Sequence, residues 1–200
     1  MKRGIREPMP YPYRIQPANT LFHVYNRGDH RQTIFRDDGD CMYFLQLIKR
    51  YKTKIETNFY HYILMPNHFH FELEIQKDDT LSKFMQGLGI THTISYNNKY
   101  QLNGHVWQGR FRSKALITDE SLLRCGRYIE LNPVRAGIVK HPADYRWSSY
   151  HAHANRLTDS IVDQHALHLQ FSSDPNHPGS YRHFIESGME HPSDLDLSWT

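Results

Sequence analysis

The pattern of apolar positions at the start of the chain predicts a strand followed by a helix. Residues 20–25, TLFHVY, are rich in β-branched and aromatic side chains, and the polar, turn-like segment NRGDHR follows them. Apolar residues then recur at helical spacing as far as Tyr51, and either Asp37 or Asp38 can cap this helix. We therefore expect a strand near the start of the chain and a helix that begins at these aspartates.

Two aromatic and branched segments in the middle of the chain predict a β-hairpin. Residues 58–65 read NFYHYILM, a turn MPN follows, and residues 68–76 read HFHFELEIQ in alternation. Thr80 can then cap a second helix that extends toward Tyr100, although two glycines weaken its middle. Residues 104–118, GHVWQGRFRSKALIT, mix turn signals with short extended runs and predict the last strand.

A third helix follows, with the sequence SLLRCGRYIELN. Asp119 or Ser121 opens it, and we expect it to end at Pro133, because the residue before a proline is pushed out of the helical conformation. The order strand, helix, strand, strand, helix, strand is the split βαβ arrangement of ferredoxin-like folds. We therefore predict an α+β protein with a ferredoxin-like βαββαβ core and additional C-terminal helices.

The chain is long enough for one domain with a substantial core, and its composition changes near residue 150. We interpret residues 1–17 as an N-terminal extension, residues 18–150 as the folded domain and residues 151–200 as an acidic, partly loose appendage. The appendage holds two arginines against seven acids, a net charge of −5, which leaves +8 in the first 150 residues. An anionic partner is therefore expected to meet those first 150 residues.

Composition argues against a membrane-spanning or disulfide-stabilised protein. No apolar run approaches the roughly 20 residues that a membrane helix needs. The basic first residues are not followed by an apolar stretch, so a secretory signal is not expected. Cys41 and Cys125 are the only cysteines, too few for a disulfide framework, and we read both as packing residues. We predict a cytoplasmic protein with no membrane contact.

Two histidines on the second strand of the predicted hairpin are candidate metal ligands. His68 and His70 flank Phe69, and alternation along a strand places both imidazoles on one face and Phe69 on the other. Such a pair can bind one metal ion, but packed histidines are the alternative in a chain that holds 15 of them. A second pair, His151 and His153, lies in a polar region, and we assign it no role.

Tyr128 and Asn132 lie four residues apart on the third predicted helix and therefore share one face of it. A phenol can attack a phosphodiester as a covalent nucleophile, and a side-chain amide oxygen can complete the shell of a cation. Core packing for the tyrosine and a helix stop for the asparagine are the alternatives. The spacing alone does not decide between these roles.

Basic residues are interleaved with aromatic ones in the segments WQGRFRSK and RCGRYIELNPVR. Guanidinium groups can hold phosphates while aromatic rings stack on unpaired bases. A solvated basic face, diluted by acidic neighbours, is the alternative interpretation. The candidate DNA-contacting residues are Trp107, Arg110, Arg112, Lys114, Arg124, Arg127 and Arg135.

Three segments in order, LMPNHFHFELEI, GHVWQGRFRS and RYIELNPVRAGIV, resemble the HUH single-tyrosine transposases of bacterial insertion sequences, and especially their REP-associated relatives. The resemblance covers roughly residues 18–150. His68 and His70 match the motif His, hydrophobic residue, His that gives the family its name. The family carries its catalytic tyrosine in a helix ahead of an Asn-Pro-Val segment, which corresponds to Tyr128. Asn132 takes the place of the polar residue that completes the family's metal site.

The resemblance implies a metal-dependent endonuclease and strand transferase on a ferredoxin-like HUH fold. It implies Mg²⁺ or Mn²⁺ held by His68, His70 and Asn132, an ion that polarises the scissile phosphate. Attack by Tyr128 then gives a 5′-phosphotyrosine link and a free 3′-hydroxyl that can later rejoin strands. The resemblance also implies recognition of single-stranded or hairpin DNA by a monomer or a homodimer.

Two other functions are compatible with the same residues. A hairpin DNA-binding protein derived from a transposase would keep the fold without catalysis, and its binding would persist when the metal is removed. A metallohydrolase would use the histidines to activate water while Tyr128 only packs. The second alternative predicts DNA cleavage without a covalent adduct between protein and DNA.

Overall fold

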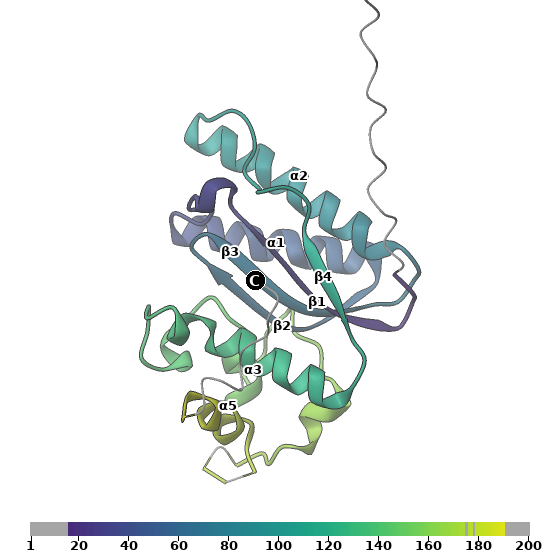
Figure 1. Cartoon of the computed structure of the whole chain (residues 1–200), viewed down its shortest axis with the longest axis vertical. Coiled ribbons are helices and arrows are strands. Elements are labelled where there is room, and N and C mark those ends of the chain that lie inside the picture. Colours follow the sequence, from purple (N-terminus) through teal and green to yellow (C-terminus); the bar gives the residue numbers. More distant parts are fainter. Residues whose placement is uncertain (1–15, 175, 178, 191–200) are drawn as a thin grey trace, which may run out of the picture.

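A four-stranded antiparallel sheet, in the order β2-β3-β1-β4, forms the centre of the protein in the computed structural model (Figure 1). Residues 16–174, 176–177 and 179–190 are described, so the predicted N-terminal extension falls almost wholly outside them. The strands are β1 (Thr20–Arg27), β2 (Thr57–Met65), β3 (His68–Ile75) and β4 (Arg112–Leu116). The longer helices are α1 (Asp38–Ile55), α2 (Thr80–Tyr100), α3 (Asp119–Arg135) and α5 (Tyr181–Glu190). Shorter helical elements are η1 (Asp29–Arg31), η2 (Pro142–Asp144), α4 (Tyr150–Ala154) and η3 (Ala166–Gln170).

The two faces of the sheet carry different layers. Helices α1 and α2 cover one face, and α3 and α5 lie on the other side of the sheet (Figure 1). The larger apolar core, which includes Phe44, Phe69 and Phe71, fills the space between the sheet and the first two helices. This is the predicted βαββαβ order followed by further helices, so the α+β ferredoxin-like fold is confirmed.

The helix starts follow side-chain chemistry that the sequence predicts only in part. Asp37 rather than Asp38 caps α1, because its carboxylate accepts a hydrogen bond from the Asp40 amide at 2.9 Å. The predicted cap at Thr80 is wrong: this residue is already helical, and its hydroxyl donates to the Lys77 carbonyl instead. Helix α2 is continuous through its two central glycines, although their helix propensity is low.

The predicted end of α3 at Pro133 is also wrong, because the helix runs through this residue to Arg135. Proline has no amide hydrogen, so the helix lacks one backbone hydrogen bond at Pro133. The last helical turn is still formed, because the Ala136 amide donates a hydrogen bond to the Asn132 carbonyl at 3.0 Å. The helix ends where Gly137 takes a left-handed conformation with φ of 68°. Pro133 is itself buried, so packing on the sheet side supports the extra turn.

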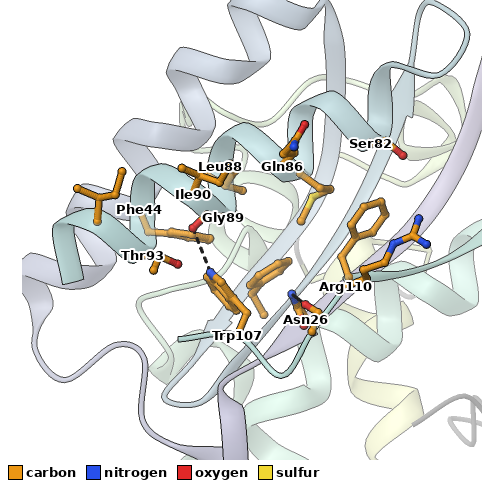
Figure 2. Close-up of a pocket in the computed structure, with 15 residues that line it drawn as sticks. Asn26, Phe44, Ser82, Gln86, Leu88, Gly89, Ile90, Thr93, Trp107 and Arg110 are labelled. Carbon is orange, nitrogen blue, oxygen red and sulfur yellow. Dashed lines mark hydrogen bonds between the residues drawn. The ribbon is translucent and has the colours of Figure 1, made fainter. Parts of the chain in front are cut away.

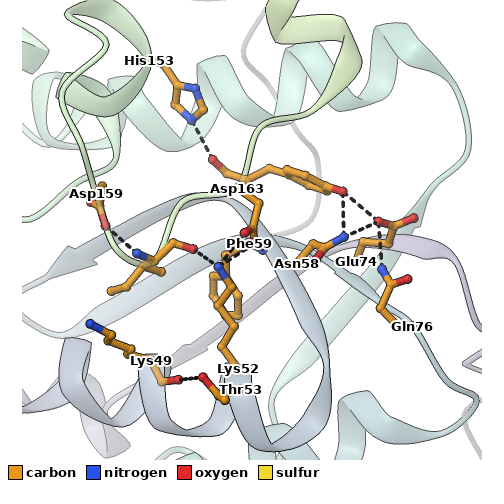
Figure 3. Close-up of polar contacts among 12 residues, drawn as sticks. Lys49, Lys52, Thr53, Asn58, Phe59, Glu74, Gln76, His153, Asp159 and Asp163 are labelled. Atoms are coloured by element: carbon orange, nitrogen blue, oxygen red, sulfur yellow. Dashed lines mark hydrogen bonds and ion pairs between the residues drawn. The ribbon is translucent and has the colours of Figure 1, made fainter.

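The C-terminal segment contacts α3 through α5, and residues 161–163 contact α1 and the edge strand β2. Lys52 on α1 donates to the carbonyl of Ile161 at 2.7 Å and forms an ion pair with Asp163 (Figure 3). The carboxylate of Asp163 in turn accepts from the Phe59 amide on β2 at 2.8 Å (Figure 3). The predicted domain boundary at residue 150 stays a prediction. Within the described ranges, none of the helices combines the length and apolar character that crossing a bilayer requires.

Candidate active site

The four residues singled out as nucleophile and metal ligands lie in one pocket of about 540 Å³ between β3 and α3. His68 and His70 come from β3, and Tyr128 and Asn132 come from the helix that packs on the same face of the sheet. They are brought together across some sixty residues of sequence. The pocket is thus a product of the topology as well as of the local motifs.

Strand alternation orients the histidine pair as the sequence predicts. Phe69 is buried against Phe44 and Trp107 in the core on the α1 and α2 side. The ring of His70 lies on the opposite side, with its centroid 5.3 Å from that of Tyr128. His68 is half-buried beside it, with its ring centroid 5.2 Å from that of His70. Both imidazoles therefore face the pocket from one side of β3.

The hydrogen bonds of His68 leave one ring nitrogen available as a ligand. Its Nδ1 lies 2.6 Å from Asn67 Oδ1, and in the tautomer protonated at Nδ1 this nitrogen donates to that oxygen. Nε2 of the neutral ring then keeps its lone pair and faces Asn132 Oδ1 at 3.3 Å. Burial lowers the pKa of His68, so the neutral ring is the form present at neutral pH. In this tautomer two acceptors face each other across 3.3 Å, whereas in the other tautomer Nε2 donates to Asn132 Oδ1.

That pair of acceptors is what a bound cation would require. Two adjacent ligands of an octahedral ion with bonds near 2.1 Å lie about 3 Å apart, close to the observed separation. His70 forms a hydrogen bond through Nδ1 with His23 Nε2 at 2.9 Å, so its own Nε2 can serve as a third metal ligand. Burial first, and then the neighbouring His23, hold the pKa of His70 well below its usual value. The residues present fit a divalent cation.

Tyr128 is almost fully buried, with 5% of its surface exposed, yet it lines the pocket. It also packs with Ile63 and Ile129 in a small apolar cluster, so the packing and functional interpretations of this tyrosine are compatible. Burial raises the pKa of the phenol, and the charge of Arg135 opposes this rise. The guanidinium of Arg135 lies 4.9 Å from the centre of the Tyr128 ring.

Three of the seven predicted DNA-contacting residues line this pocket, and the other four do not. Arg110, Arg112 and Arg135 line the pocket with the catalytic candidates. Lys114 and Arg124 are exposed outside it, and Arg124 is 3.6 Å from Glu120 in an ion pair. Arg127 points away from the pocket, because its guanidinium stacks 3.8 Å from the ring centre of Phe184 on α5. Trp107 is half-buried and packs against the apolar core.

Sequence reasoning missed pocket residues that come from β1 and the loop after it. Arg27 and Arg31 add two guanidinium groups, and Arg27 donates to Gln108 in the same wall. Tyr25 lines the pocket beside them, and His23 supports His70. Alternation places His23 and Tyr25 on one face of β1, but only the neighbouring position of β1 and β3 directs that face into this site. Among the described residues that line the pocket, none is acidic.

An apolar pocket of about 560 Å³ adjoins the first and shares Asn26 and Arg110 with it (Figure 2). It lies between α2 and the segment before β4. Trp107 forms part of its wall and donates from Nε1 to the Gly89 carbonyl at 3.2 Å (Figure 2). Phe111 and Ile90 contribute further apolar surface. The polar pocket therefore has an apolar neighbour with an arginine at their junction.

Comparison with known proteins gives a family and a fold. The sequence profile of IS200-like transposases matches residues 18–132. Comparison with curated proteins gave no match.

Two transposases are among the solved structures that are similar to the chain. A REP-associated tyrosine transposase bound to a REP hairpin is 20% identical in sequence, with a TM-score of 0.61 over 79% of this chain and 93% of that one. A proposed transposase from Deinococcus radiodurans is 13% identical, with a TM-score of 0.43 over 63% of this chain and 96% of that one. The first likeness shows a shared fold. Because the family profile covers more than half of the sequence, the chain belongs to the IS200-like transposase family.

Proposed function

We propose that the protein is a metal-dependent transposase that nicks and rejoins single-stranded DNA through a covalent link to Tyr128. The observation that carries this proposal is the convergence of His68, His70, Tyr128 and Asn132 in one pocket lined by arginines. Taken alone, the histidine pair of β3 could be packing residues, and the tyrosine and asparagine of α3 could serve packing and helix termination. The close approach of the two halves, with paired acceptor atoms between β3 and α3, favours a catalytic site.

The proposed reaction exchanges one phosphodiester for another. The phenolic oxygen of Tyr128 forms a bond to the scissile phosphorus while the bond from phosphorus to the 3′ oxygen breaks. The phenol loses one proton and the departing 3′ oxygen gains one, which leaves a 5′-phosphotyrosine and a 3′-hydroxyl. The reverse attack by a 3′-hydroxyl restores a DNA strand and the free tyrosine. No nucleotide cofactor is needed, because bond energy is conserved in the linkage.

The surrounding residues support this chemistry electrostatically. A divalent cation, Mg²⁺ or Mn²⁺, held by His68, His70 and Asn132 would supply positive charge to the scissile phosphate. Arg135, beside the tyrosine ring, favours the phenolate form that attacks. Arg110, with the other arginines of the pocket, suits the phosphates that flank the cleaved one.

The adjoining apolar pocket suits an unpaired base. Bases stack on aromatic side chains with little regard to sequence, and Trp107 and Phe111 line this pocket. Arg110 at the junction can then hold the phosphate between the stacked base and the cleaved linkage. A transposase of the same fold is bound to a hairpin of DNA repeats, and we extend hairpin DNA to this chain as its substrate class. The protein would act as a monomer or a homodimer.

The test is detection of a covalent adduct between the protein and labelled single-stranded hairpin DNA on a denaturing gel, with Mg²⁺ or Mn²⁺ present. Wild type should form the adduct, and Tyr128→Phe should lose it while it still binds the hairpin. Tyr43→Phe, on the opposite side of the sheet, is the matched control and should behave as wild type. Tyr25→Phe examines the other tyrosine in the same pocket.

Each outcome distinguishes one function. An adduct that survives in Tyr128→Phe and disappears in Tyr25→Phe would move the nucleophile to β1. Cleavage without any adduct would establish a metallohydrolase. Hairpin binding that is unaffected by chelation, with no cleavage of any hairpin in a panel, would establish a DNA-binding protein derived from a transposase.

A further inference from the structure

Three histidines that the catalytic proposal does not use meet in the interior behind α3. His61 comes from β2, His153 from α4 and His168 from η3. One nitrogen from each ring lies within 4.8 Å of the corresponding nitrogens of the other two. All three side chains are buried, and their ring centroids are 4.2 to 4.8 Å apart. Imidazoles gathered in this way need either hydrogen-bond partners or a shared cation.

The outer nitrogens of His61 and His153 have partners that suit inner nitrogens acting as ligands, whereas Nδ1 of His168 has no hydrogen-bond partner among the described residues. His61 Nδ1 lies 2.9 Å from Glu130 Oε1, and His153 Nε2 donates to the Tyr60 carbonyl at 2.7 Å (Figure 3). A carboxylate and a backbone carbonyl behind the outer nitrogens are the usual supports of metal-binding histidines. His61 Nε2 and the remaining nitrogen of His153 then carry lone pairs.

The spacing across the cluster is close to that of a tetrahedral ion. His61 Nε2 and His168 Nε2 are 3.1 Å apart. Two nitrogens bound to zinc at 2.0 to 2.1 Å with tetrahedral angles lie about 3.3 Å apart.

The charge balance of the cluster also favours a cation. Glu130 is fully buried, and its Oε2 has no hydrogen-bond partner among the described residues. Its other oxygen, Oε1, accepts from Ser149 Oγ at 2.6 Å and lies 2.9 Å from His61 Nδ1. A divalent ion on the far side of His61 would compensate the carboxylate.

Solvent reaches the cluster from one side. A cleft of about 280 Å³ is lined by His153 and His168, together with Gln164 and Ser180. It provides an entry path for an ion and room for a water molecule as a further ligand.

We propose that His61, His153 and His168 bind one zinc ion, with water from the cleft in the fourth position, at a site separate from the DNA-cleavage pocket. The class of ion follows from three neutral imidazoles and tetrahedral spacing, which suit Zn²⁺ and its substitute Co²⁺. The three ligands come from segments separated by up to 107 residues, so the ion would fasten α4 and η3 to the sheet. Its role is therefore structural.

The test measures metal binding by the full chain with the DNA-cleavage pocket disabled by His68→Ala. We expect one equivalent of zinc to survive gel filtration, measured by mass spectrometry of the metal. We expect Co²⁺ to give the intense visible absorption of a tetrahedral site. Zinc at 100 times its dissociation constant should raise the melting temperature by roughly 5 to 10 °C.

Variants in the same background locate the ion. His168→Ala should weaken zinc binding at least about 100-fold, and Glu130→Gln should weaken it about 10- to 100-fold by removing the support of His61. His105→Ala, at an exposed position, is the matched control and should bind as the parent does. Circular dichroism establishes that each variant is folded.

Two results would overturn the proposal. One is a folded His68→Ala parent that retains no zinc and shows no tetrahedral Co²⁺ spectrum, which would leave a hydrogen-bonded histidine cluster. The other is binding of equal strength in His168→Ala and the control, which would place the ion elsewhere. Neither result depends on DNA cleavage, so this test is independent of the proposed function.

Discussion

A buried histidine on the opposite side of the sheet from both proposed metal sites should make the stability of the protein depend on pH. His92 on α2 is 2% exposed, and the rings of Phe44 and Trp107 lie 4.9 and 5.1 Å from it, centre to centre. Its Nδ1 has no hydrogen-bond partner among the described residues. Burial lowers the pKa of His92 to about 4, against 6.5 for an exposed histidine. The folded protein therefore holds this ring neutral.

The sign and size of the effect follow from these two values. As the pH falls below 6.5, the unfolded chain takes up a proton at His92 before the folded chain does. The contribution of His92 to the unfolding free energy is therefore fully present above pH 6.5 and is lost as the pH falls toward 4. The difference of about 2.5 pKa units corresponds to about 3.4 kcal/mol, of which about 2 kcal/mol is already lost at pH 5.

The substitution His92→Phe removes the titrating group and suits the aromatic surroundings. Between pH 7.5 and pH 5, the variant should lose about 2 kcal/mol less unfolding free energy than wild type. Urea denaturation of both proteins at the two pH values, followed by circular dichroism, measures this difference. Other buried histidines, such as His23 with its pKa of about 4, contribute equally to both proteins and cancel. Equal losses in wild type and variant would refute the reasoning, and His105→Phe controls for an exposed site.

Three further substitutions examine other contacts. Gly126→Ala places a Cβ 2.6 Å from Nε2 of buried His61, and the resulting overpacking should lower the melting temperature by several degrees; an unchanged melting curve would contradict this. Lys52→Met removes the ion pair with Asp163, so hydrogen exchange measured by mass spectrometry should accelerate in residues 159–163 and stay slow in the sheet. Arg135→Gln should slow adduct formation about 100-fold with little change in melting temperature, and an unaffected rate would exclude it from the reaction.

Local periodicity was sufficient for the parts of the site that lie on one element. Alternation places His68 and His70 on one face of β3, and a four-residue step places Tyr128 and Asn132 on one face of α3. Both arrangements hold in the structure. The contact between these faces of β3 and α3 could be predicted only from the strand order, which the ferredoxin-like pattern and the family resemblance provide.

Features that depend on long-range contacts were not accessible in this way. The histidine cluster draws its members from three elements, and nothing in the sequence links His61 and His168 to the pair His151 and His153. Of the neighbouring pair His151 and His153, only the second enters the cluster, because the first points to the Ala143 carbonyl. The continuation of α3 through Pro133 has the same origin: tertiary packing stabilises a turn that the local preference disfavours.

Helix α3 connects the two proposed sites. Tyr128 and Asn132 face the DNA-cleavage pocket, while Glu130 between them points to the histidine cluster. On its outer surface the helix is held by α5, through Arg127 stacked on Phe184. We therefore expect the distance from the proposed nucleophile to the histidines of β3 to depend on the packing of the C-terminal segment against this helix. The acidic C-terminal segment would then act as a support for α3 at the proposed catalytic site, although it supplies no residue to the pocket among those described.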